Sequence, residues 1–172
     1  MDLRFMSPNL RSFDAAGTEL LACAVWRDEL PMRGAAGLLD WRLAGTLSHL
    51  ARRGFFAGEL GEVLFLPGRP RLCFEKVLVF GLGARSGFGE GTFRIVISHL
   101  LRALTGLRVR RAVVELPGRA DGFVEAERAC ELLLECVGDS EDHDAWWLVE
   151  PLDAQKRIAE RAHDERRRSR KG

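Results

Sequence analysis

The chain has 172 residues, of which 47% are hydrophobic and 30% are charged, with a formal net charge of +1. These values are typical of a soluble globular protein and exclude neither enzymes nor binding modules. The charge gives no reason to expect nucleic acid as a partner. No apolar run approaches the roughly 20 residues that span a bilayer, and residues 1–14 lack the apolar stretch of a signal peptide. We therefore expect a cytoplasmic protein without membrane association.

The apolar run at 19–26 predicts a strand that is covered on both faces. Leucine spacing predicts a helix over 35–54 that ends at Gly54. The later elements are predicted, in chain order, as strands over 62–67 and 76–82, a helix over 91–107, a strand over 109–118, a helix over 120–138 with Phe123 facing inward, a strand over 145–151, and a polar helix from Leu152.

This alternation of helices with apolar strands predicts the fold class α/β. We expect a three-layer α/β/α sandwich with a mixed, mostly parallel sheet. The length suits a single domain over residues 1–172, because a chain of this size buries a sizeable core without disulfides or metals. The core is expected over about 15–150, and a basic C-terminal helix or tail over 151–172.

Charge is distributed unevenly along the chain. Residues 115–150 hold eleven acids and two bases, whereas residues 155–172 hold eight bases and three acids. The asymmetry indicates either an interaction tail or two solvated faces that partly neutralise each other. The tail has no interleaved aromatic residues, so nucleic acid is disfavoured as its partner.

Cysteine spacing predicts no metal site. Cys23, Cys73, Cys130 and Cys136 are scattered and no pair has C-x-x-C spacing, so a zinc ribbon or a thioredoxin-type site is disfavoured. We expect reduced, packed thiols. We predict no cofactor.

The stretch "KVLVFGLGARSGFGEG" (76–91) is a strand followed by a glycine-rich loop and a helix. In α/β sheets such loops lie beyond the carboxyl ends of strands, where free backbone amides can hold a phosphate. Its spacing departs from the compact dinucleotide fingerprint, and no Gly-Lys-Ser/Thr follows. The alternative is that the first two glycines only permit close packing and a sharp exit from a buried strand. The candidate ligand-binding residues are Gly81, Gly83, Arg85, Ser86 and Gly87.

The order of elements, and "VLVFGLG" (77–83) above all, resembles the N-terminal domain of leucyl aminopeptidases, the M17 peptidase family. The resemblance covers roughly residues 15–137. It implies a fold similar to macro domains, without catalytic metal ligands, that helps to build the oligomer in full-length enzymes. The family's catalytic signature Asn-Thr-Asp-Ala-Glu-Gly-Arg is absent, and Asn9 is the only asparagine. The resemblance therefore implies no peptidase activity in this chain and no metal or catalytic residues.

Two further patterns are candidate sites. Asp142, His143 and Asp144 are consecutive, and successive side chains diverge, so we expect a solvated acidic loop. Trp146 and Trp147 lie in the last predicted strand, where one indole would be buried and the other exposed at a docking edge. A strand buried on both sides is the alternative.

Two functions stay open at this point. The first is a non-catalytic module for protein interaction or assembly, with self-association or another protein as the partner and Trp146 and Trp147 as candidate contacts. The second is a macro-like module that binds ADP-ribose or a related nucleotide through the Gly81–Gly91 loop, whose amides would cradle a diphosphate.

Overall fold

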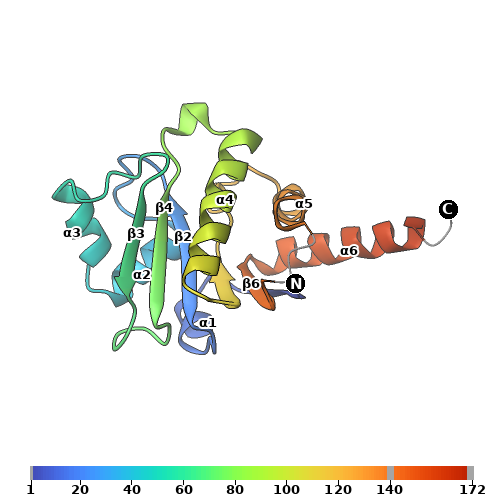
Figure 1. The fold of residues 1–172 in the computed structure, drawn as a ribbon, viewed down its shortest axis with the longest axis horizontal. Coiled ribbons are helices and arrows are strands. Elements are labelled where there is room, and N and C mark those ends of the chain that lie inside the picture. The colour runs from blue at the N-terminus through green and yellow to red at the C-terminus, as the bar shows by residue number, and fades with distance from the viewer. Residues whose placement is uncertain (1, 139–141, 170–172) are drawn as a thin grey trace.

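A computed structural model of the protein describes residues 2–138 and 142–169 (Figure 1). Its elements follow in chain order. They are β1 (Asp2–Met6), α1 (Leu10–Asp14), β2 (Leu20–Val25), α2 (Gly34–Arg42), α3 (Thr46–Arg52), β3 (Val63–Pro67), β4 (Lys76–Gly81), the short 3-10 helix η1 (Arg85–Gly87), α4 (Glu90–Gly106), β5 (Arg111–Val114), α5 (Ala126–Val137), β6 (Ala145–Val149) and α6 (Leu152–Ser169).

The described strands form one six-stranded sheet in the order β1-β6-β5-β2-β4-β3. Neighbouring strands are parallel except at one end, where β3 pairs with β4 in the antiparallel sense. Leu21 lies between Val77 of β4 and Val113 of β5, so β2 is at the centre of the sheet. The mixed, mostly parallel sheet predicted from the sequence is confirmed.

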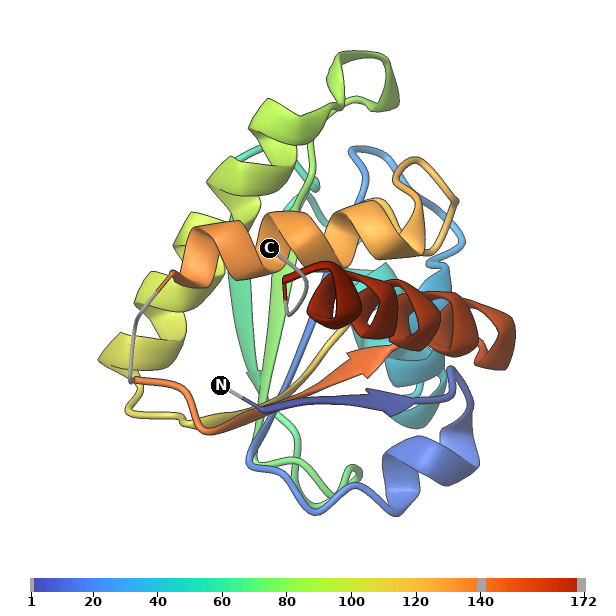
Figure 2. The same cartoon turned by 90° about the vertical axis from the view of Figure 1, so that its right-hand side faces the viewer.

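Alternate residues of the central strand enter two separate cores. Leu20 and Ala22 pack with residues of α4, α5 and α6, whereas Leu21 and Cys23 pack with residues of α1, α2 and α3. Because successive strand residues point to opposite faces, an apolar strand of this kind needs helices on both sides. Figures 1 and 2 show these two helical layers with the sheet between them. The α/β/α sandwich is confirmed.

The helix predicted over 35–54 is two helices. Ala44 and Gly45 have φ of 54° and 78°, and the chain turns there between α2 and α3. Asp40 fixes the turn, since its backbone carbonyl accepts a hydrogen bond from Gly45 N at 2.8 Å and its carboxylate accepts one from Ser48 N at 3.1 Å. Leucines recur at helical spacing on both sides of the break, so periodicity alone did not reveal it.

Phe123 lies outside the helix in which it was predicted to face inward. Helix α5 begins at Ala126, and Phe123 is 46% exposed in the loop before it. One side of its ring nevertheless packs on Trp26, with ring centres 4.8 Å apart.

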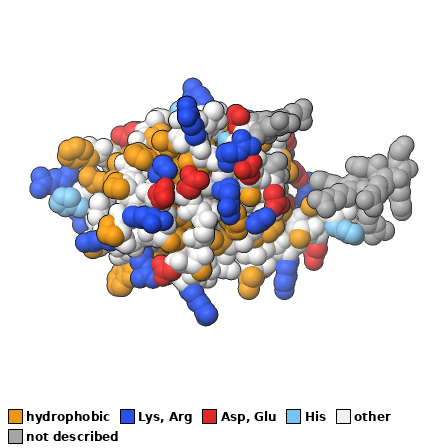
Figure 3. All heavy atoms as spheres, turned by 60° about the horizontal axis from the view of Figure 1, so that its bottom comes forward, with side chains coloured by type: hydrophobic (Ala, Val, Ile, Leu, Met, Phe, Trp, Pro, Cys, Tyr) orange, Lys and Arg blue, Asp and Glu red, His pale blue; other side chains and the backbone are white. Residues whose placement is uncertain are grey.

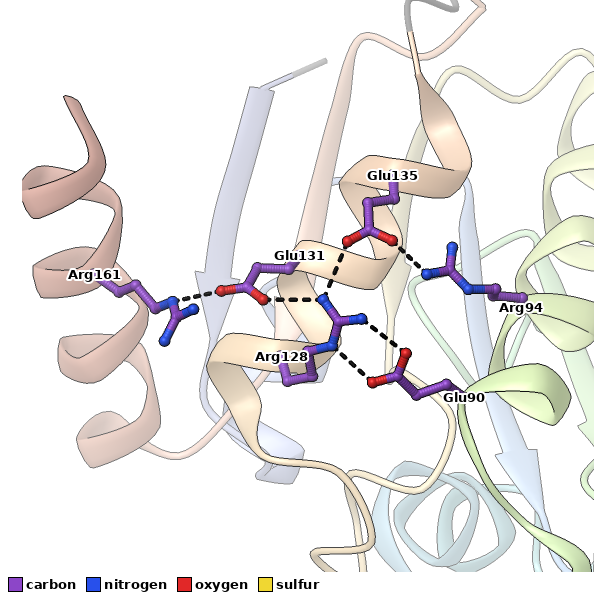
Figure 4. Close-up of polar contacts among 6 residues, drawn as sticks. All are labelled: Glu90, Arg94, Arg128, Glu131, Glu135 and Arg161. Carbon is purple, nitrogen blue, oxygen red and sulfur yellow. Dashed lines mark hydrogen bonds and ion pairs between the residues drawn. The ribbon is translucent and has the colours of Figure 1, made fainter. Parts of the chain in front are cut away.

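Ion pairs join α4, α5 and α6 on the outer surface (Figure 4). The Arg128 guanidinium binds both carboxylate oxygens of Glu90, at 2.8 and 2.7 Å, and also reaches Glu131 and Glu135 at 3.1 Å. Glu131 and Glu135 then pair with Arg161 and Arg94. The uneven charge was interpreted either as an interaction tail or as two faces that neutralise each other. For these residues the second interpretation applies, because acids of α5 pair with a base of α6. Side chains beyond His163 lie outside the description.

Candidate functional site

The loops that follow β2, β4 and β5 meet at the carboxyl ends of these strands, where ligands of open α/β sheets usually bind. Three carboxylates lie in this crevice: Glu29 after β2, and Glu115 and Asp121 after β5. We call these three residues the acidic crevice. The cavity among them measures only about 10 Å³, so the chain's own side chains fill the place of a ligand.

Trp26 and Asp121 form the outer wall of the acidic crevice. The indole Nε1 donates a hydrogen bond of 2.6 Å to Asp121 Oδ2, and the Trp26 ring packs edge-on against Phe88, with centres 4.9 Å apart. The Glu29 carboxylate accepts a hydrogen bond from Trp26 N at 3.1 Å. These contacts fix two of the three carboxylates relative to the end of β2.

Arg85 closes the acidic crevice from the glycine-rich loop. Its Nη2 lies 2.9 Å from Glu29 Oε1 and 3.4 Å from Asp121 Oδ2, and its guanidinium lies 5.2 Å from the centre of the Trp26 ring. Arg33 adds a contact of 3.3 Å to Asp121 Oδ1. The candidate ligand-binding residue Arg85 is therefore engaged by acids of its own chain.

Glu115 lies deepest in the acidic crevice. Its Oε1 accepts a hydrogen bond of 2.9 Å from Ala35 N in the first turn of α2, where helix N–H groups are otherwise unpaired. Gly34 permits this approach, because a Cβ there would lie 2.6 Å from the same oxygen. The carboxylate therefore occupies a helix N-terminus where an anionic ligand could otherwise bind.

Burial sets the charge of these acids. It raises the pKa of Glu115 to about 8, with a further contribution from the neighbouring carboxylates of Glu150, Glu29 and Asp121. Burial also raises the pKa of Glu29. Burial opposes ionisation of Asp121 as well, but hydrogen bonds from Trp26 and Arg85 outweigh it and hold its pKa below the ordinary value. At neutral pH the protonated form of Glu115 is favoured.

We predict that Glu115→Gln removes a pH dependence of stability. The folded-state pKa of about 8 exceeds the ordinary value of 4.5, so between these values the folded protein binds more protons than the unfolded chain. The free energy of unfolding therefore falls as pH rises through this window and levels off above it. Urea unfolding of both proteins across the window should show the variant gaining relative stability as pH rises, and parallel curves would contradict the assignment.

The glycines of the loop differ in their surroundings. At Gly81 a Cβ would lie 2.0 Å from the Glu59 carbonyl oxygen, and Gly83 has a φ of +73°, so packing and backbone shape explain both. Ser86 and Gly87 lie exposed in η1, and nothing lies within 4 Å of a Cβ built on Gly87. Of the candidate site residues, Gly81 and Gly83 are thus buried, whereas Arg85, Ser86 and Gly87 form an exposed turn.

Charge around the loop opposes a phosphate ligand. Helix α4 begins at Glu90, so a negative charge already stands at the end of the helix where a phosphate would bind. Arg128 pairs with this carboxylate. An anion that entered the acidic crevice would also approach Glu29 and Asp121 and compete with them for Arg85. A cationic or neutral group would fit this arrangement better than a diphosphate.

The two tryptophans of β6 do not lie at a sheet edge. Strand β6 pairs with both β1 and β5. Trp146 is fully buried, and Trp147 is partly buried with Arg4 and Arg111 lying 5.0 and 5.4 Å from its ring centre. The hypothesis of an exposed edge at these residues is therefore wrong, and the alternative of a strand buried on both sides describes β6 better.

His143 was expected in a solvated loop, but it is 4% exposed and packs edge-on against Trp146 at 5.3 Å. Asp144 is exposed and pairs with Arg110 at 2.8 Å. Within residues 2–138 and 142–169, no group of three or more His, Cys, Asp or Glu side chains is arranged to hold a metal ion. In the same ranges, no helix has the length and apolarity to cross a membrane.

The sequence singled out Arg85 but missed the acids that bind it. Glu29 and Asp121 stand in loops without a recognisable motif. A usable signal was that each follows one of the strands whose carboxyl ends meet at the same edge of a parallel sheet.

Comparison with known proteins agrees with this fold. A family model described as the cytosol aminopeptidase family, N-terminal domain, matches residues 23–142. A probable cytosol aminopeptidase of Halorhodospira halophila is 38% identical over 86 residues, which are 50% of this chain and 17% of that relative. The chain thus matches less than a fifth of the relative's length, in a part that the family model assigns to the N-terminal domain.

Two solved structures illustrate the likeness in fold. A Trypanosoma brucei macrodomain in complex with ADP-ribose has a TM-score of 0.68 at 17% identity, over 93% of this chain and 68% of that one. A tomato leucine aminopeptidase has a TM-score of 0.64 at 17% identity, over 92% of this chain and 35% of that one. The domain is macrodomain-like in fold, and with the family match over residues 23–142 the chain belongs to the cytosol aminopeptidase family through its N-terminal domain.

Proposed function

We propose that the chain is a non-catalytic module that acts by associating with protein. The match is to the N-terminal domain of the family alone, and the sequence lacks the catalytic signature that the family resemblance calls for. The acidic crevice is filled by its own ion pairs, and the cavity among its three carboxylates measures only about 10 Å³. The relatives' name, cytosol aminopeptidase, is in keeping with a cytoplasmic setting for this association.

One observation carries the proposal. Among the described residues, four large hydrophobic side chains are exposed within the single segment 55–67, namely Phe55, Leu60, Val63 and Phe65. We call these four residues the apolar edge, because the segment ends in the edge strand β3. Figure 3 shows hydrophobic side chains at the surface of the end of the molecule that carries α3 and β3, on the left. Exposed apolar side chains beside an uncovered edge strand favour association.

The opposite edge of the same sheet provides a contrast. Strand β1 carries Asp2 and Arg4, which pair with each other at 2.8 Å, and charged edge residues prevent strand addition. Strand β3 reads Val-Leu-Phe-Leu-Pro and has no charge. Of the two edges, only β3 lacks this protection, so we assign the association surface to it.

We predict that the purified chain associates in a concentration-dependent way and that Phe65→Arg weakens this association about tenfold or more, since burying a charge at a central contact is costly. Sedimentation velocity over a wide concentration range measures the effect. Trp41→Arg is the matched control, because Trp41 is 74% exposed on α2 and lies outside the apolar edge. A chain that stays monomeric throughout would contradict the proposal.

ADP-ribose binding at Gly81–Gly91 is the alternative, and the macrodomain crystallised with ADP-ribose is the observation in its favour. The engaged Arg85, the buried Glu115 and the carboxylate of Glu90 weigh against it. Calorimetric titration with ADP-ribose tests this alternative directly, and saturable heat that disappears in Arg85→Ala would favour it over association.

A further inference from the structure

The backbone of β3 presents unpaired hydrogen-bonding groups along its outer side. Gly81 N donates to Glu62 O and Gly68 N donates to Glu75 O, both at 2.9 Å. With the register Val63 opposite Phe80, residues 62, 64, 66 and 68 therefore bond to β4. Because paired and outward residues alternate in an antiparallel ladder, the N–H and C=O groups of Val63 and Phe65 and the C=O of Pro67 face away from the sheet.

We propose that this edge pairs with β3 of a second copy of the chain, antiparallel and about a two-fold axis, to form one continuous twelve-stranded sheet, twice the six strands of the single chain. The inference rests on the proposed function and names the partner of the same surface. A two-fold interface uses the same patch on both copies. An uncharged edge strand meets that demand because it offers alternating donors and acceptors to its own copy.

Pro67 selects the register. If Phe65 stood opposite Phe65 of the second copy, Val63 would face Pro67, which has no N–H to donate to the Val63 carbonyl. With Val63 opposite Phe65 of the second copy, each outward N–H of these two residues meets a carbonyl. Leu64 then stands opposite Leu64 of the second copy, on the two-fold axis.

Side chains support the same register. Val63 and Phe65 are 44% and 52% exposed and lie on one face of the sheet, since they are two residues apart in a strand. Across the two-fold axis they become a valine–phenylalanine cross-strand pair, and pairs of an aromatic with a β-branched residue stabilise antiparallel sheets.

Charge at the two ends of β3 is complementary for an antiparallel partner. Glu59 precedes the strand, is 51% exposed and lies 3.5 Å from Arg27, and Arg69 follows the strand, is 68% exposed and lies 3.8 Å from Glu75. In the proposed register the Glu59 end of one copy lies against the Arg69 end of the other. Opposite charges at such a rim favour this orientation over a parallel one, which would set like charges together.

Disulfide trapping tests the pairing. Leu64→Cys should give a covalent dimer under mild oxidation, because residues on the axis face each other at the short separation of a non-hydrogen-bonded pair. Arg4→Cys, on the exposed edge strand β1, and the unmodified chain with its four cysteines are the controls and should give no covalent dimer under the same oxidation. Cross-linking of Arg4→Cys at the same rate would overturn the proposal, since it would report random collision.

Hydrogen exchange provides a second measurement that needs no substitution, in case Leu64→Cys does not fold. The amides of Val63 and Phe65 should exchange slowly at high protein concentration and quickly on dilution. If the chain associates in sedimentation while these amides exchange quickly at every concentration, the pairing is overturned and the proposed function stands. If the chain does not associate at all, both fail.

Discussion

Replacing Arg119 by methionine should destabilise the protein by about 3–5 kcal/mol, because it would leave a buried carboxylate without its partner. Arg119 Nε and Nη2 each lie 2.7 Å from an oxygen of Glu150, and the two side chains are only 9% and 2% exposed. This pair joins the loop after β5 to the end of β6. Chemical denaturation monitored by circular dichroism measures the loss in the free energy of unfolding.

The double variant Arg119→Met with Glu150→Leu is the control for this prediction. Exchanging both members of a buried ion pair for apolar side chains is often neutral, so the double variant should regain most of the stability that the single variant loses. Equal instability of the single and double variants would indicate that packing of the Arg119 stem, rather than the unpaired charge, dominates. A single variant as stable as the parent would contradict the prediction outright.

Gly81→Ala should destabilise the protein by about 3 kcal/mol or more, as expected when a methyl group is forced into a filled space. The new Cβ would lie 2.0 Å from the Glu59 carbonyl oxygen and 2.7 Å from the Gly58 carbonyl carbon. Both are backbone atoms, which cannot turn aside as a flexible side chain does. Thermal and chemical unfolding both measure the effect.

Gly87→Ala is the matched control from the same loop. Nothing lies within 4 Å of a Cβ built at Gly87, so this change should leave stability within about 0.5 kcal/mol of the parent. Equal losses at the two positions would show that the loop as a whole, and not the close approach of Gly81 to residues 58–59, requires glycine.

The sequence predicted the strands and helices whose residues are apolar in a regular pattern. Strands β2 and β4 are buried on both faces and α4 has a broad apolar stripe, so local patterns were sufficient for them. Strand β1 was missed because Asp2 and Arg4 alternate with only partly buried neighbours at the edge of the sheet. The position of β6 between β1 and β5 depends on pairing between residues far apart in sequence, which no local pattern reports.

The candidate site shows the same limit. Arg85 was a candidate because it stands in the glycine-rich loop that follows a buried strand. Whether Arg85 binds a ligand or acids of its own chain depends on where Glu29 and Asp121 lie. These two acids reach Arg85 only because the loops after β2, β4 and β5 come together in the folded protein. Sequence reasoning therefore pointed to the glycine-rich loop but could not tell that acids of the same chain bind its Arg85.

The place of β6 in the sheet has a consequence for synthesis. Among the described strands, β1 pairs with β6 alone, so β1 must wait for β6, which is synthesised about 140 residues later, before it can join the sheet. Until Ala145–Val149 emerge, the side of β5 that will receive them stays open, and the amino-terminal segment is untethered. Contacts this distant in sequence form slowly, so we infer that this inserted strand closes the domain last. Nascent chains that end before Ala145 should accordingly lose residues 2–6 to proteases that spare the finished protein.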